Sequence, residues 1–345
     1  MNREEADGDD WRSVSTRVPD EETIRIAKER ARELGHGRSA AQPSEIPPAG
    51  WRDILKRVFW AVPRDRVLST AGGVAFFALL STFPGIATIV SLYSLFADPA
   101  VIGQHLSVLI GVLPDGVLDL ISAQLQHVAQ QGTGTLSTAS LLSFLIAFWS
   151  ANSGVVALFD ALNVIYRERE KRALVRVYAT TFLFTTTGAI VTVAAIGIVV
   201  GVPILLNEIG FGARTDTVIR IMRWPALIFL VSLGLSLVYR YGPSRREAKW
   251  RWVSWGSAVA AIGWVGASAA FSWYVVTFDT YNRIYGSLGA GIGFMSWIWI
   301  SIVIVLLGAE LNSEMERQTA RDSTIGQPRP LGSRKAFAAD TVGPP

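Results

Sequence analysis

The chain has 345 residues, of which 50% are hydrophobic and only 17% are charged. Its mean hydropathy of +0.34 is unusual for a soluble domain and favours a membrane protein. Because it has no cysteine and only three histidines, the composition excludes disulfides, thiolate catalysis and cysteine-based metal sites.

Residues 1–50 are polar and charged, with proline and glycine scattered among them. They show no sustained apolar period and no apolar run after a basic start, which predicts a disordered tail and not a cleavable signal peptide. Residues 318–345 are predicted to form a second disordered tail. The predicted folded domain is therefore 51–317.

An amphipathic helix is predicted at the start of this domain. Apolar residues recur at helical spacing and charged residues take the other face: Trp51, Ile54, Leu55, Val58 and Phe59 against Arg52, Asp53, Lys56 and Arg57. A basic face directly before a membrane span favours a helix that lies in the headgroup plane. The alternative is a helix that packs in a soluble domain.

Six long apolar stretches follow, each longer than the ~20 residues that cross a bilayer. They cover about 68–97, 139–165, 174–206, 218–239, 252–278 and 288–311. The first contains Pro84, which predicts a kink. The expected fold class is all-α: a polytopic membrane protein with a bundle of six transmembrane helices and an N-terminal interfacial amphipathic helix.

The basic residues between these stretches alternate in number. The first, third, fifth and last intervals hold 28 Lys and Arg, and the intervals between them hold four, with none at 98–138. Basic residues stay on the cytoplasmic side during insertion, so the pattern predicts six spans with both termini in the cytoplasm. The basic charge therefore indicates topology, and no nucleic-acid partner is expected.

Two external regions carry further expectations. The 98–138 segment has helical apolar spacing in runs too short to span a bilayer, which predicts one or two short helices on the outer face or over the bundle. Arg283 is the only basic residue of the 279–287 loop. It is a candidate contact for a lipid headgroup or another anionic ligand, and an ordinary surface arginine is the alternative.

Polar side chains inside the spans are the best functional pointers, because charge in hydrocarbon is costly. Five candidates for a polar path or substrate contact lie toward the cytoplasmic ends of the second and sixth spans: Asn152, Asp160, Asn163, Glu310 and Asn312. Their depths predict that Asp160 and Glu310 face each other. The alternative is an ion-pair network that fixes the two helices to the basic loops.

Motifs for enzyme chemistry are missing from the sequence. There is no Walker loop, no serine nucleophile elbow, no HExxH and no cluster of histidine and aspartate for a catalytic metal. We therefore expect a protein that is not an enzyme and that has no cofactor or metal site.

Three runs of sequence resemble the YihY/BrkB family of bacterial inner-membrane proteins, a family whose members often carry the label ribonuclease BN. These runs are GGVAFFALLSTFPG (72–85), FWSANSGVVALFDALNVIYRERE (148–170) and YGSLGAGIGFMSWIWISIVIVLLGAELNSE (285–314). With the six-span layout, the resemblance covers about 51–317. Family members more often have a second proline where this chain has Gly85, which implies a softer kink.

The resemblance implies six helices, a location in the bacterial inner membrane and a role in moving or organising lipids or other envelope molecules. Others of the family are linked by name to virulence. The ribonuclease label conflicts with this sequence, because metal-dependent RNA cleavage needs clustered histidine and aspartate. The leading hypothesis is a transporter or transport accessory, with membrane lipids and an envelope lipid or small molecule as partners. A membrane scaffold is the alternative, and a ribonuclease ranks last.

Overall fold

The computed structural model describes residues 19–93, 138–209, 213–278 and 289–345 of the chain. These residues form helices and connecting loops, and within them the only β-type pairing is one isolated bridge between Ala248 and Thr324. The all-α fold class is thus confirmed. The predicted 98–138 helices and Arg283 lie outside the described residues, apart from Thr138.

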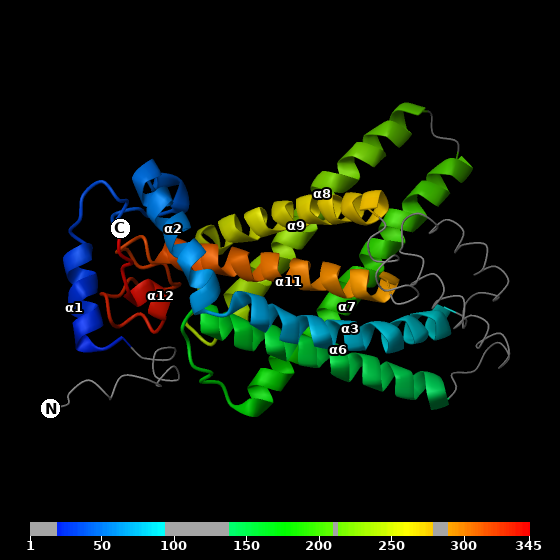
Figure 1. Ribbon diagram of the computed structural model, residues 1–345, viewed down its shortest axis with the longest axis horizontal. Coiled ribbons are helices and arrows are strands. Elements are labelled where there is room, and N and C mark those ends of the chain that lie inside the picture. Colours follow the sequence, from blue (N-terminus) through cyan, green and yellow to red (C-terminus); the bar gives the residue numbers. More distant parts are fainter. Residues whose placement is uncertain (1–18, 94–137, 210–212, 279–288) are drawn as a thin grey trace.

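The described residues include six long helices, which Figure 1 shows. They are α3 (Val67–Tyr93), α6 (Thr138–Ile165), α7 (Leu174–Ile209), α8 (Ala213–Tyr241), α9 (Trp250–Phe278) and α11 (Gly289–Glu316). Each overlaps one predicted span. α11 packs against both α9 and α3, α3 packs against α6, and α8 packs against α9, while α7 contacts chiefly α6. α11 is therefore the central helix.

Four of these helices contain a segment long and apolar enough to cross a membrane: Phe144–Ile165, Leu174–Thr192, Trp250–Val275 and Gly291–Glu316. α3 and α8 contribute shorter apolar segments, Val67–Thr82 and Pro225–Tyr241. The chain is a multi-pass membrane protein by these features, and the count of six spans stays a prediction. Large apolar side chains such as Phe76, Leu183 and Phe229 are exposed on the long helices, as lipid-facing residues would be.

Close helix contact depends on two glycines, Gly256 of α9 and Gly308 of α11. A Cβ atom at Gly256 would collide with the Gly308 carbonyl and with the side chain of Asn312. A Cβ atom at Gly308 would lie 2.6 Å from the Tyr239 hydroxyl of α8 and 2.8 Å from the Gly256 carbonyl. The absence of side chains here lets α8, α9 and α11 meet at backbone distance, as is common between membrane helices.

One end of the bundle carries both ends of the described chain, and we call it the tail end. It comprises α1 (Glu21–Arg30), a 3₁₀ turn (Pro43–Glu45), α2 (Pro48–Arg64), the loops 166–173 and 242–249, and residues 317–345 with α12 (Phe337–Asp340). Figure 1 shows α1 and α12 side by side beyond the ends of the long helices. The structure thus gives order to residues 19–50 and 318–345, where the sequence predicted disorder.

α2 is the predicted amphipathic helix, and Pro48 starts it because proline fits the first helical turn. It buries Ile54 and Ala61, and its charged residues Asp53 and Arg57 are also buried. Phe59 and Trp60 remain exposed, at 70% and 63%. The sequence predicted that the charged face of α2 would be the exposed one. Instead, the charged residues Asp53 and Arg57 point inward, and the apolar residues Phe59 and Trp60 point outward.

Pro84 lies inside α3, and the helix continues past it to Tyr93. The hydroxyls of Ser81 and Thr82 donate to the carbonyl of Ala78 one turn earlier, at 2.8 and 2.9 Å. Such bonds from a side chain to the preceding turn accompany helix bends. The kink itself remains a prediction.

Candidate functional site

Three of the five polar candidates join their helix to another helix or to a loop. Asn312 of α11 accepts from the Gly256 backbone N–H at 2.9 Å and donates to the Val253 carbonyl at 3.1 Å, which joins α11 to α9. Asn163 of α6 accepts from the backbone N–H of Ser244 at 2.7 Å. Asn152 accepts a longer bond, 3.4 Å, from the Thr185 hydroxyl of α7. All three asparagines are buried, and each has a partner from another element.

Asp160 and Glu310 have different surroundings. Asp160 lies on the exposed side of α6, and its charged neighbours are Glu170 and Arg172. Glu310 is completely buried, and its charged neighbours include Asp65 and Arg64 from the end of α2. Neither acid is among the charged neighbours of the other, so the structure does not bring them together.

Among the side chains that the structure describes, Glu310 is the only one with two buried polar atoms that lack a hydrogen-bond partner. Both of its carboxylate oxygens are buried and neither has a hydrogen-bond donor. The Asp65 carboxyl is close enough for a hydrogen bond between the two carboxyls. Two carboxyls can make such a bond only when one of them carries a proton. Arg64 Nη2 forms an ion pair with the Asp65 carboxylate at 2.6 Å. Of the two carboxyls, Glu310 is therefore the one suited to carry the proton.

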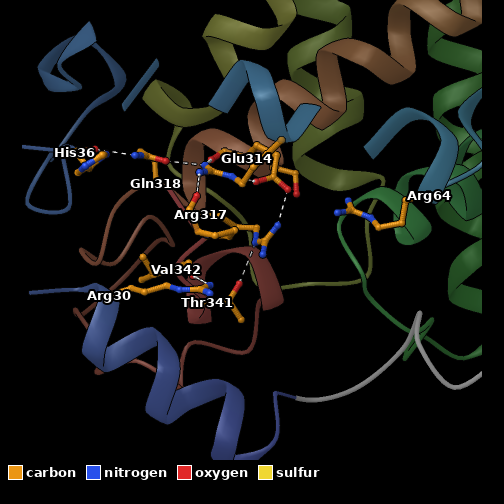
Figure 2. A network of polar contacts seen from close by, with 12 residues as sticks. Arg30, His36, Arg64, Glu314, Arg317, Gln318, Thr341 and Val342 are labelled. Carbon is orange, nitrogen blue, oxygen red and sulfur yellow. Dashed lines mark hydrogen bonds and ion pairs between the residues drawn. The ribbon is translucent and has the colours of Figure 1, made fainter. Parts of the chain in front are cut away.

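One turn further along α11, Glu314 is the centre of a buried ion network (Figure 2). Its carboxylate accepts from Arg57 Nε of α2 at 2.6 Å and from Arg317. Arg57 also donates to the Gln318 side chain at 2.6 Å, and Gln318 in turn donates to the carbonyl of His36 at 2.7 Å. These bonds connect α11 to α2 and to the segment before α2.

The last residues of the chain complete this network. Arg317 Nε donates to the Thr341 hydroxyl at 3.3 Å, as seen in Figure 2. Arg57 donates to the carbonyl of Pro344 at 2.6 Å, and Arg38 donates to that of Gly343 at 2.9 Å. The C-terminal segment is thus held by arginines from three separate parts of the tail end.

A second charged cluster lies between the loops that follow α6 and α8. Arg245 makes two bonds to Glu316 of α11, at 2.7 and 3.0 Å, and both side chains are fully buried. Its guanidinium carbon also lies 4.1 Å from the centre of the Tyr166 ring. Burial raises the pKa of the Tyr166 hydroxyl, while the nearby Arg245 lowers it. This cluster fixes the loop 242–249 against the bundle.

The same two loops, with residues 332–340, line an open cavity of about 1370 Å³ that we call the basic cavity. Three acids and nine basic residues line it, the latter being Arg167, Arg169, Lys171, Arg172, Arg176, Arg240, Arg245, Arg246 and Lys335. Burial lowers the pKa of Arg167 to about 10, and the nearby cations Arg317 and Arg64 add to this. The excess of positive charge makes the cavity suited to an anion.

The sequence did not identify two of these features. The basic loops were interpreted only as a sign of topology, although their charge density also marks the walls of the cavity. Asp65 was missed because it lies in the turn between α2 and α3, outside every predicted span. In the part of the chain that the structure describes, no group of three or more His, Asp and Glu side chains is placed to hold a metal ion.

Comparisons with known proteins give consistent results. The sequence model of the family described as virulence factor BrkB matches residues 58–331. A protein of Bacillus subtilis named putative ribonuclease-like protein YfkH is 27% identical over 273 residues, which cover 77% of this chain and 96% of that protein. No solved structure matches the chain.

Proteins named as UPF0761 membrane proteins are similar over comparable lengths. One from Vibrio parahaemolyticus is 28% identical over 78% of this chain and 83% of its own length. Another, from Haemophilus influenzae, is 22% identical over 75% of this chain and 94% of its own length. The similarity therefore extends over most of each relative.

Proposed function

The chain belongs to the virulence factor BrkB family of membrane proteins, and from this premise we propose that it moves, or helps to move, lipids or other envelope molecules across a membrane. We place it in the bacterial inner membrane with both termini in the cytoplasm. The 28 to four division of basic residues between alternate intervals supports this orientation. The tail end then faces the cytoplasm.

The observation that carries the transport proposal is the carboxyl pair of Glu310 and Asp65. An ionised carboxylate without a donor is expensive inside a membrane protein, and such groups typically serve ion or proton pathways. Uptake of a proton by Glu310 would neutralise it and allow a hydrogen bond to Asp65, and release of the proton would break that bond. We propose that this exchange drives the movement between α2 and α11 that transport requires.

The test compares Glu310→Gln with the wild-type protein in liposomes. Glutamine keeps the size of the side chain and its ability to donate a hydrogen bond, but it cannot exchange a proton. We expect the variant to fold normally and to lose at least ~10-fold in the rate at which a fluorescent phospholipid crosses the bilayer, which corresponds to ~1.4 kcal/mol in barrier. A folded Glu310→Gln protein with wild-type transport would overturn the proposal.

Asp160→Asn is the matched control, since it also removes one carboxylate but from an exposed position in α6. We expect this variant to retain transport within about two-fold, because Asp160 is not part of the Glu310–Asp65 pair and has Glu170 and Arg172 as its charged neighbours. If both variants insert, remain stable and restore function in a deletion strain, no polar path exists at these residues.

The alternative is a scaffold that binds partners without moving a substrate. It predicts that Glu310→Gln has full activity in the cell and that changes on the exposed surface of the tail end abolish it. The name of YfkH suggests ribonuclease activity for that protein. For this chain we rank it last, and RNA cleavage by the purified protein that a single acidic substitution abolishes would be needed to support it.

A further inference from the structure

The acids of the basic cavity are already occupied by other partners. Glu168 accepts from Lys171 Nζ at 2.7 Å and from the backbone N–H of Phe337 at 2.7 Å. Glu247 pairs with Arg240 at 3.2 Å, and Asp340 accepts from backbone N–H groups of its own loop. None of these carboxylates is therefore free to neutralise the remaining basic side chains.

Several nitrogen atoms of the cavity lack an acceptor. Arg240 Nε, Arg245 Nε and Arg246 Nη1 are buried atoms without a hydrogen-bond partner. The Arg245 side chain is 0% exposed and that of Arg240 is 9% exposed, so water does not reach these groups freely. Buried donors are nearly always satisfied in folded proteins. These three nitrogens have almost no accessible surface, so they lie behind the cavity wall, and a ligand would meet the more exposed cations of the cavity instead.

The backbone helps to place one of these donors. Gly326 has a φ of +86°, and a Cβ atom there would lie 2.6 Å from Arg246 Nη2. A residue with a side chain would both strain this turn and displace the guanidinium. The C-terminal segment therefore packs directly on the Arg246 guanidinium.

We propose that the basic cavity binds a phosphate group, carried either by a lipid headgroup or by a small soluble molecule. A phosphate offers several acceptor oxygens, and guanidinium forks match its geometry. The chain supplies five cavity-lining cations with no carboxylate partner among the residues that the structure describes: Arg167, Arg169, Arg176, Arg246 and Lys335. This proposal does not depend on the transport proposal, because it uses none of the same residues.

The position of the cavity makes both sources of phosphate accessible. Arg176 lies in the first turn of α7 and Arg240 in the last turn of α8, where the apolar segments begin and end. Leu174 and Val175 beside Arg176 are 77% and 82% exposed. Apolar side chains next to a cation suit a site at the level of the lipid headgroups.

The test uses the full-length protein in nanodiscs of phosphatidylcholine and measures its unfolding temperature. One series adds inorganic phosphate against chloride at equal ionic strength, and the other replaces part of the lipid by phosphatidic acid. We expect stabilisation in at least one series, since a ligand that binds only the folded state raises its stability. Phosphate alone stabilising the protein indicates a soluble ligand, and phosphatidic acid alone indicates a lipid headgroup.

The double variant Arg176→Gln with Arg246→Gln should weaken the binding at least ~10-fold, because it removes two charge-assisted donors. Arg329→Gln is the control, since it removes one exposed positive charge of the C-terminal segment outside the cavity. Glu310→Gln should bind phosphate like wild type even if it fails to transport. The proposal is overturned if neither probe stabilises the protein, if Arg329→Gln weakens binding as much as the double variant, or if a short RNA binds more tightly than both probes.

Discussion

Arg57 of α2 donates to the carboxylate of Glu314 of α11 at 2.6 Å, although 257 positions separate them in the sequence. The two side chains are 9% and 1% exposed. Arg57→Ala would leave the buried Glu314 carboxylate with Arg317 as its ion-pair partner and would also remove the bonds from Arg57 to Gln318 and Pro344, and breaking a buried ion pair costs up to about 3–5 kcal/mol. We therefore expect Arg57→Ala to lower the unfolding free energy of the purified protein by several kcal/mol.

Arg52→Ala is the control for this prediction, because Arg52 is an exposed residue of the same helix. Such surface changes usually alter stability by less than about 0.5 kcal/mol. Chemical unfolding in detergent, followed by tryptophan fluorescence, measures both variants. Equal stability of the Arg57 and Arg52 variants would mean that the pair contributes nothing to the fold.

Gly256 gives a second prediction, on helix packing. In Gly256→Ala the new methyl group would collide with the Gly308 carbonyl of α11 and with Asn312. Overpacking of this kind typically costs about 1–3 kcal/mol, and here it also threatens the hydrogen bond from the Gly256 N–H to Asn312. We expect a clear fall in the unfolding temperature.

Gly266→Ala is the matched control on the same helix, because a Cβ atom there meets nothing within 4 Å. Alanine is also a better helix former than glycine by about 1 kcal/mol, so this variant should be as stable as wild type or slightly more stable. If the two alanine variants unfold at the same temperature, α9 and α11 are not in backbone contact.

The long helices were predictable because apolar runs separated by charged loops leave few alternatives. The predicted stretch 139–165 agrees with α6, which covers Thr138–Ile165. The prediction that Asn152, Asp160 and Asn163 of that helix serve one polar path was less reliable. At 3.6 residues per turn, Asp160 lies about 80° around the helix from Asn152. That angle is large enough to bury Asn152 and to leave Asp160 on the exposed side.

The order of the tails was not predictable from hydrophobic pattern, because polar contacts hold them. The guanidinium of Arg334 is an example: it donates to four backbone carbonyls, those of Ala320, Arg321, Arg329 and Ala339. A composition rich in charge, proline and glycine normally indicates disorder, since it offers little apolar surface to bury. Here polar side chains elsewhere in the tail end, such as Arg38 and Arg57, supply hydrogen-bond partners for the C-terminal segment.

Arg334 therefore gives a third prediction. In Arg334→Ala four backbone carbonyls lose their donor, so residues 320–340 should open locally. We expect faster trypsin cleavage after Arg321 and Lys335, with little change in the unfolding of the long helices. Arg329→Ala is the control, since its side chain is exposed and its carbonyl remains in place. Equal cleavage rates in the two variants would show that Arg334 does not hold the segment.

The last prediction concerns acid stability and Glu170, in the loop 166–173. Burial would raise the pKa of this carboxyl, but bonds from the Arg172 side chain and backbone and from Ser244 outweigh it and lower the pKa to about 2. Arg172 makes these bonds at 2.7–2.8 Å. Because the folded pKa is below the ordinary value of 4.5, ionised Glu170 stabilises the fold above about pH 4.5.

This stability should be lost as the pH falls from about 4.5 towards 2, because in that range the unfolded state takes up a proton on Glu170 that the folded state does not yet bind. Glu170→Gln should be less stable than wild type at pH 7 and should show a flatter decline over that acid range. Unfolding temperatures between pH 7 and 2.5 measure the effect, with Glu21→Gln, an exposed acid of α1, as the control. Parallel acid curves for wild type and Glu170→Gln would rule out this carboxylate as the clamp between the loop 166–173 and the loop 242–249.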